Sequence, residues 1–250
     1  MIDKQLITRR FSRAVESYNR EAVAQKRIVC RMSDMLEHHL SRPCGRVLEI
    51  GSGTGFLTRR LVEMFHPKEL VLNDICQEMS VCFTDLLENG QATFWAGDAE
   101  TLSFPGDQDL IVSCSALQWF VSPERFFARC HVLLRAKGCF AFTTFGKDNL
   151  KEIASVAGSG LHYRSLEELK ETLCMHYEIV DACEERICLT FDTPLQVLYH
   201  LKHTGVSAVR QLAWTKRNLQ DFCDKYVRLF SDGHSVTLTY HPIYIIAKKK

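Results

Sequence analysis

The sequence lacks the long apolar segments that would commit a chain to a membrane or to secretion. No apolar run approaches the ~20 residues that a membrane span needs. The first twenty residues, MIDKQLITRRFSRAVESYNR, contain no apolar core of a signal peptide, and acidic residues interrupt them, unlike a transit peptide. We therefore expect a cytoplasmic protein with no membrane partner.

An excess of charge of either sign is also missing. The chain has 31 lysines and arginines against 30 aspartates and glutamates, which gives a formal net charge of +1. No global basic field therefore favours binding to nucleic acid or to a membrane. No stretch interleaves basic with aromatic residues as RNA-binding surfaces do. We expect no nucleic-acid partner.

The eleven cysteines include no C-x-x-C pair. Several, such as Cys114, lie within apolar runs, where a cysteine acts as a small buried hydrophobe. Two close histidine pairs, His38/His39 and His200/His203, have no cysteine or acid that would complete a known ligand pattern. The sequence therefore predicts reduced thiols in the core and no metal site.

What the chain does contain is a regular alternation of strand-like and helix-like segments. Apolar, β-branched runs at 46–50, 69–74, 92–98, 109–115 and 138–146 alternate with helical patterns at 56–65, 77–88 and 123–134. Alternation at this pitch is typical of a mostly parallel sheet with helices on both faces. We therefore expect an α/β fold.

The two ends of the chain follow a different pattern. Apolar residues at three- and four-residue steps predict a helical segment over about 9–40. After Gly146 we expect a helix at 165–173, a long strand at 177–191, a helical stretch at 194–231 and a closing strand at 235–249, with Lys248–Lys250 as a frayed tail. With no linker or repeat, residues 1–250 are predicted to form a single domain whose helical cap, residues 194–231, precedes the last strand.

Three glycines follow the first strand in EIGSGTG, residues 49–55. Glycines permit a tight turn and a close approach of the backbone to a ligand, although such a turn can also be purely structural. Asp74 ends the second strand about twenty residues later, and Asp98 follows the third. Each acid alone could be a helix cap. All three features fall at the carboxyl edge of the sheet, where such folds bind ligands, and together they predict a binding site.

The glycine spacing, with an acid two residues before the first glycine, resembles motif I of the class I S-adenosylmethionine-dependent methyltransferases. The resemblance implies a Rossmann-like, seven-stranded fold with S-adenosyl-L-methionine as cofactor. It implies that Glu49 holds the glycine loop and the cofactor's amino group, that Asp74 accepts the ribose hydroxyls, and that Asp98 with Ala99 lies at the adenine amino group. The remaining cofactor contacts that it implies are Gly51, Ser52, Gly53, Gly55, Ile75, Met79 and Ser115.

Longer segments resemble a narrower family over nearly the whole chain. FSRAVESYNREAVAQ, SALQWF, FTTFGKDNLKE and LTYHPIYIIAKK are similar to the malonyl-acyl-carrier-protein O-methyltransferases of biotin synthesis. Ser52 departs from a common cysteine of that family. The resemblance implies methylation of the free carboxylate of a malonyl thioester, on acyl carrier protein or on coenzyme A. Such a carboxylate is ionised at neutral pH and needs no general base.

Fewer sequence features indicate which residues bind the methyl acceptor. Tyr18, Gln118 and Trp119 are candidates to shape the acceptor pocket, although each could be a packing residue. Arg210 is a candidate to contact the substrate carboxylate, because a carboxylate suits a guanidinium fork. A basic face for the acidic carrier protein could come from Arg9, Arg10 and Arg13, or from Lys216, Arg217 and Lys225, although such charges are often only solvated. Two alternatives remain: a small-molecule or quinone-ring methyltransferase, and a cofactor-binding protein without transfer activity.

Overall fold

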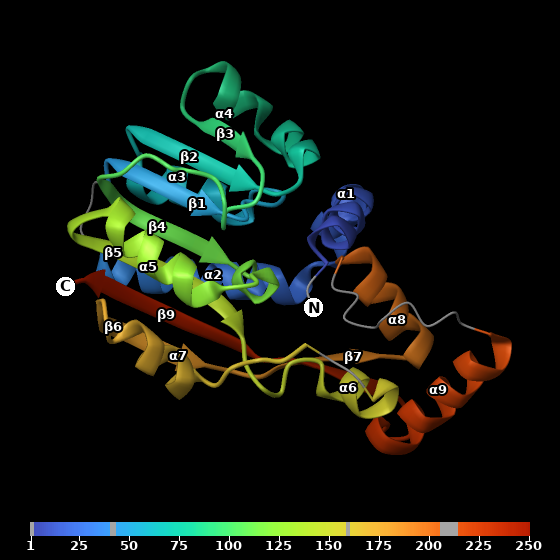
Figure 1. Cartoon of the computed structure of the whole chain (residues 1–250). Coiled ribbons are helices and arrows are strands. Elements are labelled where there is room, and N and C mark those ends of the chain that lie inside the picture. Colours follow the sequence, from blue (N-terminus) through green and yellow to red (C-terminus); the bar gives the residue numbers. More distant parts are fainter. Residues whose placement is uncertain (1–2, 41–43, 159–160, 206–214) are drawn as a thin grey trace.

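A seven-stranded sheet forms the centre of the computed structural model (Figure 1), which describes residues 3–40, 44–158, 161–205 and 215–250. The strand order is β3-β2-β1-β4-β5-β9-β6. The first five strands are parallel: β1 (Arg46–Ile50), β2 (Glu69–Asp74), β3 (Thr93–Ala96), β4 (Gln108–Cys114) and β5 (Leu134–Phe145). Strand β9 (Pro242–Lys249) is antiparallel to β5 and to β6 (Tyr177–Glu184). The predicted mostly parallel seven-stranded fold is confirmed.

Helices cover both faces of this sheet, because successive strand residues point to opposite sides. In β1, Val47 belongs to the core under α2 (Val23–His39), α3 (Phe56–Phe65) and α4 (Thr84–Glu88). The next residue, Leu48, belongs to the core under α5 (Pro123–Leu133) and α7 (Leu166–Leu173). The inner strands β1, β4, β5 and β9 are largely buried on both faces, and this explains their nearly continuous apolar sequences.

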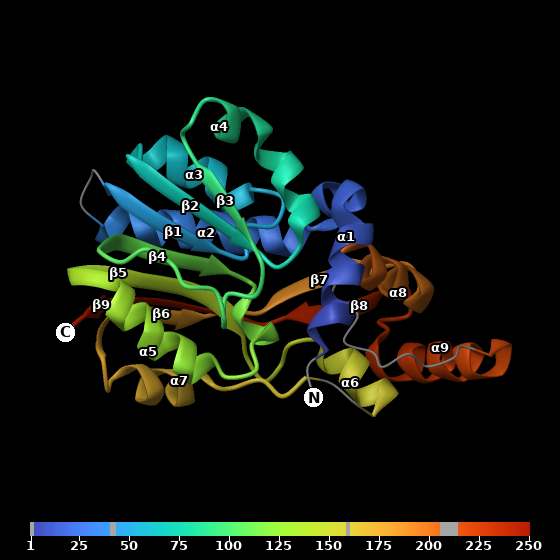
Figure 2. The same ribbon diagram turned by 45° about the horizontal axis from the view of Figure 1, so that its top comes forward.

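Helix α1 (Lys4–Glu21) lies near the ends toward which β1–β4 point, as Figures 1 and 2 show. It begins five residues before the expected start near residue 9, because the Asp3 side chain caps it by accepting a hydrogen bond from the Leu6 N–H (3.0 Å). Ala22 separates α1 from α2 and has non-helical backbone angles. The N-terminal segment is therefore two helices rather than one.

Two of the predicted strands were wrong in their extent. The segment 177–191 is split into β6 and β7 (Ile187–Phe191), and 235–249 is split into β8 (Val236–Tyr240) and β9. Strands β6 and β9 pair in the main sheet, whereas β7 and β8 form a separate two-stranded sheet. Pro242 stands at the second break and has no N–H to continue a ladder.

The segment 194–231 contains α8 (Pro194–His203) and α9 (Lys216–Phe230), which lie beside the β7–β8 pair and α6 (Lys151–Ala157). The cap is thus backed by a small sheet that the sequence pattern did not predict. Whether residues 1–250 act as one domain stays a prediction.

None of the described cysteines forms a disulfide, and Cys30, Cys174 and Cys188 are exposed rather than in the predicted core. The frayed lysine tail was wrong, because Lys249 belongs to β9 and its Nζ donates to the Leu134 carbonyl (2.6 Å). Within the described ranges no helix is long and apolar enough to cross a membrane.

Candidate active site

The glycine turn between β1 and α3 is held by backbone hydrogen bonds to β2. The N–H groups of Gly51 and Ser52 both donate to the Asn73 carbonyl (2.8 and 2.9 Å). Gly51 has φ +70°, and a Cβ there would lie 2.4 Å from the Ala116 Cβ. Gly53 has φ +53°, but a Cβ there would meet nothing within 4 Å. Gly51 is therefore needed for packing, whereas Gly53 leaves open space over the backbone.

A mostly apolar cavity opens at this turn, between the carboxyl ends of the strands and α1. Its walls come from the glycine turn, the ends of β2, β3 and β4, the 3-10 helices η1 (Gln77–Phe83) and η2 (Leu117–Trp119), and α1. The structure brings together in its lining these predicted residues: Tyr18, Gly51, Gly53, Asp74, Ile75, Met79, Asp98, Ala99, Ser115 and Trp119.

Asp74 ties two elements of the cavity wall together. Its Oδ2 accepts a hydrogen bond from the Gly53 N–H, and its Oδ1 accepts one from the Cys76 N–H, both at 2.9 Å. Burial raises the pKa of the Asp74 carboxyl, and these backbone donors oppose that rise. Asp74 thus stabilises the two turns, but it is not the helix cap of the alternative interpretation, because η1 has Cys76 at its N-cap and no side-chain cap. A carboxylate has about four acceptor positions, so the backbone donors leave room for a ligand donor.

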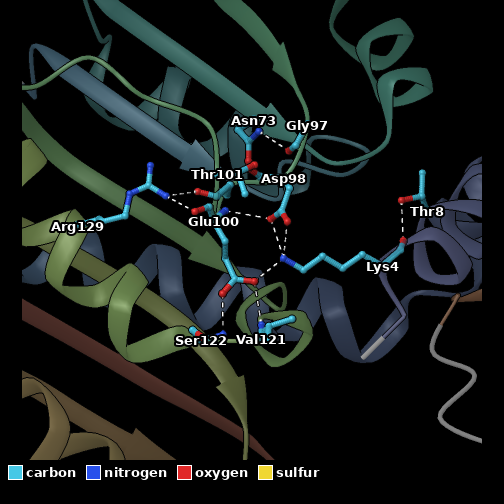
Figure 3. A network of polar contacts seen from close by, with 11 residues as sticks. Lys4, Thr8, Asn73, Gly97, Asp98, Glu100, Thr101, Val121, Ser122 and Arg129 are labelled. Carbon is cyan, nitrogen blue, oxygen red and sulfur yellow. Dashed lines mark hydrogen bonds and ion pairs between the residues drawn. The ribbon is translucent and has the colours of Figure 1, made fainter. Parts of the chain in front are cut away.

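Asp98 follows β3 and is held by a residue that the sequence analysis missed (Figure 3). Both of its carboxylate oxygens accept from the Lys4 ammonium (2.7 and 2.6 Å), and Oδ1 also accepts from the Glu100 N–H (3.0 Å). The Asn73 side chain donates to the carbonyls of Trp95 and Gly97, which fixes the turn that carries Asp98.

Glu49 lies beneath the glycine turn rather than in the main cavity. It is 2% exposed, and its Oε2 accepts from the Thr58 hydroxyl (2.7 Å). Burial raises the pKa of Glu49 to about 8. Glu49 and Ser52 line a smaller cavity that shares Tyr18 and Gly53 with the main one. Gly55 caps α3, and a Cβ there would lie 2.8 Å from the Phe83 ring.

Consecutive residues of η2 face different cavities. Trp119 lines the main cavity and packs edge-on against Phe11 of α1, with ring centroids 6.2 Å apart. Gln118 instead lines a neighbouring cavity, and its Nε2 donates to the Ser115 carbonyl (2.6 Å). Trp119 Nε1 and Gln118 Oε1 are buried atoms with no hydrogen-bond partner among the described residues. Unpaired buried polar atoms in a cavity wall suit contact with a ligand.

Besides Tyr18, α1 supplies three lining residues that were not predicted: Lys4, Ile7 and Phe11. The sequence feature that could have revealed them is Asp3: as an N-cap it predicts a helix that begins at Lys4 rather than near residue 9. Arg210 lies outside the described residues. In the described ranges no group of three or more His, Cys, Asp or Glu side chains could hold a metal ion.

Comparison with known proteins gives consistent findings. Residues 48–142 match the model of a methyltransferase domain family. The chain is 51% identical to a malonyl-acyl-carrier protein O-methyltransferase of Bacteroides thetaiotaomicron, covering 100% of this chain and 99% of that protein. It is 36% identical to the Haemophilus influenzae protein of the same name, covering 99% and 95%. Among solved structures, a Haemonchus contortus phosphoethanolamine N-methyltransferase in complex with S-adenosyl-L-methionine is similar in fold, with a TM-score of 0.57, 16% identity, and coverage of 94% of this chain and 56% of that one.

Proposed function

The chain belongs to the malonyl-acyl-carrier-protein O-methyltransferase family, and on this premise we propose that it methylates the free carboxylate of a malonyl thioester on acyl carrier protein. The methyl donor is S-adenosyl-L-methionine, and the methyl ester primes the pimeloyl chain of biotin. The observation that carries the proposal is the 51% identity to a relative of that name along the whole chain.

The residues of the main cavity fit such a cofactor. Asp74 and Asp98 offer acceptor positions to hydroxyl and amine donors, and the open space over Gly53 admits a ligand against the backbone. Glu49 lies beneath the glycine turn, where an approaching ammonium group of the cofactor would favour the ionised form of this carboxyl. When bound, the cofactor supplies an activated methyl group on a sulfonium centre.

The protein's own contribution is to orient the two substrates and to exclude water. Ile7, Phe11, Trp119 and Phe120 give the main cavity an apolar wall. A sulfonium and a carboxylate lose their charges as the methyl group transfers, so an apolar environment favours the reaction. Burial raises the pKa of the Tyr18 hydroxyl, so this side chain stays protonated at neutral pH. Its role is therefore to position the substrate and not to remove a proton. Holding both reactants in line supplies much of the rate.

Helix η2 is proposed to separate the donor from the acceptor. Trp119 faces the main cavity, whereas Gln118 faces the neighbouring cavity, whose wall also includes Thr144, Tyr163 and Arg164. This arrangement supports the assignment of Gln118 and Trp119 to substrate positioning. Contact between Arg210 and the substrate carboxylate stays a prediction.

The free thiols support a cytoplasmic location, because disulfides are rare in that compartment. The alternative acceptor is malonyl-coenzyme A, which presents the same carboxylate without a protein surface.

Transfer of label from methyl-labelled cofactor tests the proposal. Purified protein should label malonyl-acyl carrier protein and should leave acetyl-acyl carrier protein, which lacks the second carboxylate, unlabelled. The rate should stay flat from about pH 6 to 8, because the acceptor is already ionised there. A steep rise over that range, or labelling of the acetyl thioester, would favour a ring methyltransferase, since a phenol must lose its proton. Cofactor binding without any transfer would indicate a cofactor-binding protein.

A further inference from the structure

The first residue of α1 joins two acidic side chains at the edge of the main cavity (Figure 3). The Lys4 ammonium donates to both oxygens of Asp98 (2.7 and 2.6 Å) and to Oε2 of Glu100. Its three N–H groups are therefore all used. Burial alone would lower the pKa of Lys4, but the contacts with Asp98 and Glu100 raise it, so the ammonium stays charged at neutral pH.

Glu100 connects this contact to the chain that follows η2. Its carboxylate accepts hydrogen bonds from the N–H groups of Val121 (2.8 Å) and Ser122 (2.7 Å). Arg129 of α5 donates to the carbonyls of Ala99, Glu100 and Leu102. The loop of residues 98–102 is thus fixed to α5 independently of α1, and Lys4 attaches α1 to this loop.

The position of Lys4 is unfavourable for the helix itself. A cation in the first turn opposes the helix dipole, and the acid that complements the dipole at this end is the capping residue Asp3. The favourable partners of Lys4 are instead 94 and 96 residues away in sequence. Its place is therefore explained by tertiary contacts rather than by helix stability.

One face of α1 forms a wall of the main cavity. Lys4, Ile7, Phe11 and Tyr18 all line it, at steps of three, four and seven residues that put them on one side of a helix. Phe11 also contacts Trp119, and the Lys4 ammonium lies 5.5 Å from the centre of the Phe120 ring. A ligand in this cavity lies against this face of α1, so the position of α1 affects how the ligand is held.

We propose that Lys4 is a positioning residue of the cofactor site, whose ion pairs with Asp98 and Glu100 hold α1 closed over the bound cofactor and keep Asp98 turned into the cavity. This inference rests on the proposed function, because it assigns the main cavity to the cofactor. Closure does not exclude an adenine contact. Asp98 Oδ2 accepts from Lys4 alone among the described residues, so it has room for a further donor.

Dissociation of S-adenosylhomocysteine, followed by stopped-flow displacement, tests this role. Lys4→Met keeps the length of the side chain and removes its charge, and should release the ligand about tenfold faster, the change that ~1.4 kcal/mol produces. Lys4→Arg keeps the charge and should stay within about threefold of the wild type. Arg20→Met removes the same charge from the other end of α1, where the side chain is exposed and pairs with Glu21, and should change nothing.

The salt dependence of the release rate distinguishes an ion pair of Lys4 from apolar packing of its side chain. Raising ionic strength should speed release from the wild type but not from Lys4→Met, because partly exposed ion pairs are screened. Glu100→Gln weakens the same contact from its other side and should also speed release, which keeps the test decisive if Lys4→Met does not fold.

The possible results distinguish the two proposals. Equal release rates for the wild type and the Lys4→Met or Glu100→Gln variants, with the ligand still bound by all of them, would overturn the role of Lys4 and leave the proposed function intact. A wild-type protein that binds no S-adenosylhomocysteine would overturn both.

Discussion

At the scale of single residues, the site depends on carboxyl groups that the fold buries. Glu49 is 2% exposed and Asp74 is 8% exposed, and burial raises the pKa of both. Burial disfavours the ionised form until a cation or a hydrogen-bond donor arrives. A binding site for a cationic ligand is thus expected to reduce the stability of the empty protein.

Glu49→Gln should show this effect in stability. The folded pKa of Glu49, about 8, lies above its ordinary value of 4.5. Its contribution is therefore fully present below about pH 4.5 and is lost as pH rises through about 8. Glutamine still accepts the hydrogen bond from Thr58 but carries no charge. The difference in melting temperature between the variant and the wild type should therefore shift in favour of the variant as pH rises. Exposed Glu69→Gln is the control, and parallel pH curves for Glu49→Gln would contradict the prediction.

Asp74→Ala should weaken cofactor binding and loosen the glycine turn together. The substitution leaves the Gly53 and Cys76 N–H groups without their acceptor. Each unsatisfied group costs about 1–3 kcal/mol, and we expect affinity for S-adenosylhomocysteine to fall roughly 10- to 100-fold. Calorimetric titration measures it, with exposed Asp85→Ala as control. A lower melting temperature with unchanged affinity would leave Asp74 as a turn cap only.

Residues at strand ends could be predicted from the sequence, whereas of the residues from α1 that line the main cavity only Tyr18 was predicted. Asp74 and Asp98 follow recognisable strands, and parallel strands bring their carboxyl ends to one edge. Lys4 belongs to no local pattern, because its partners are distant in sequence and its position opposes the helix dipole. The open space over Gly53 and the contact of Gly51 with Ala116 likewise depend on tertiary packing.

At the scale of elements, the main sheet followed from periodicity but the breaks within elements did not. The junction at Ala22 has neither glycine nor proline, so the helical pattern continues through it. The segment 177–191 reads as one strand, yet its halves pair with different partners. The local sequence indicates that this segment is extended, but the strand with which each half pairs is determined by the rest of the fold.

Helix α8 supports α1, and a glycine pair can test that support. Gly205, which follows α8, has φ +69°, and a Cβ there would lie 2.7 Å from the Phe11 ring. Gly158, which follows α6, has φ +68° with nothing within 4 Å. Alanine at either position imposes a similar backbone strain of about 1–2 kcal/mol. Only Gly205→Ala should also displace Phe11 and lower affinity for S-adenosylhomocysteine several-fold. Equal affinities for the two variants would show that α8 does not position α1.

At the scale of the whole molecule, a nearly balanced net charge coexists with exposed basic residues on α1 and α9. The net charge is +1, yet Arg9 and Arg13 are exposed on α1, and Lys216 and Arg217 are exposed at the start of α9. Figures 1 and 2 show α1, α8 and α9 together at the end of the molecule toward which β1–β4 point. In the proposed function, an acidic carrier protein brings its thioester to the cavity that Gln118 lines, next to the main cavity, and these exposed basic residues are candidates to dock it.

The salt dependence of the reaction should therefore differ between the two thioesters. Exposed charges are screened over about 8–10 Å at physiological ionic strength, so the KM for malonyl-acyl carrier protein should rise with salt. Malonyl-coenzyme A lacks the protein surface and should respond differently. Arg9→Glu with Arg13→Glu should raise the KM for the carrier-bound substrate and flatten its salt dependence, with kcat little changed, because rim charges act on encounter. Lys68 is an exposed residue just before β2, at the opposite edge of the sheet; Lys68→Glu reverses one charge there and should have no such effect. The same salt response for both thioesters would mean that the enzyme recognises the malonyl group and its thioester arm without docking the carrier protein.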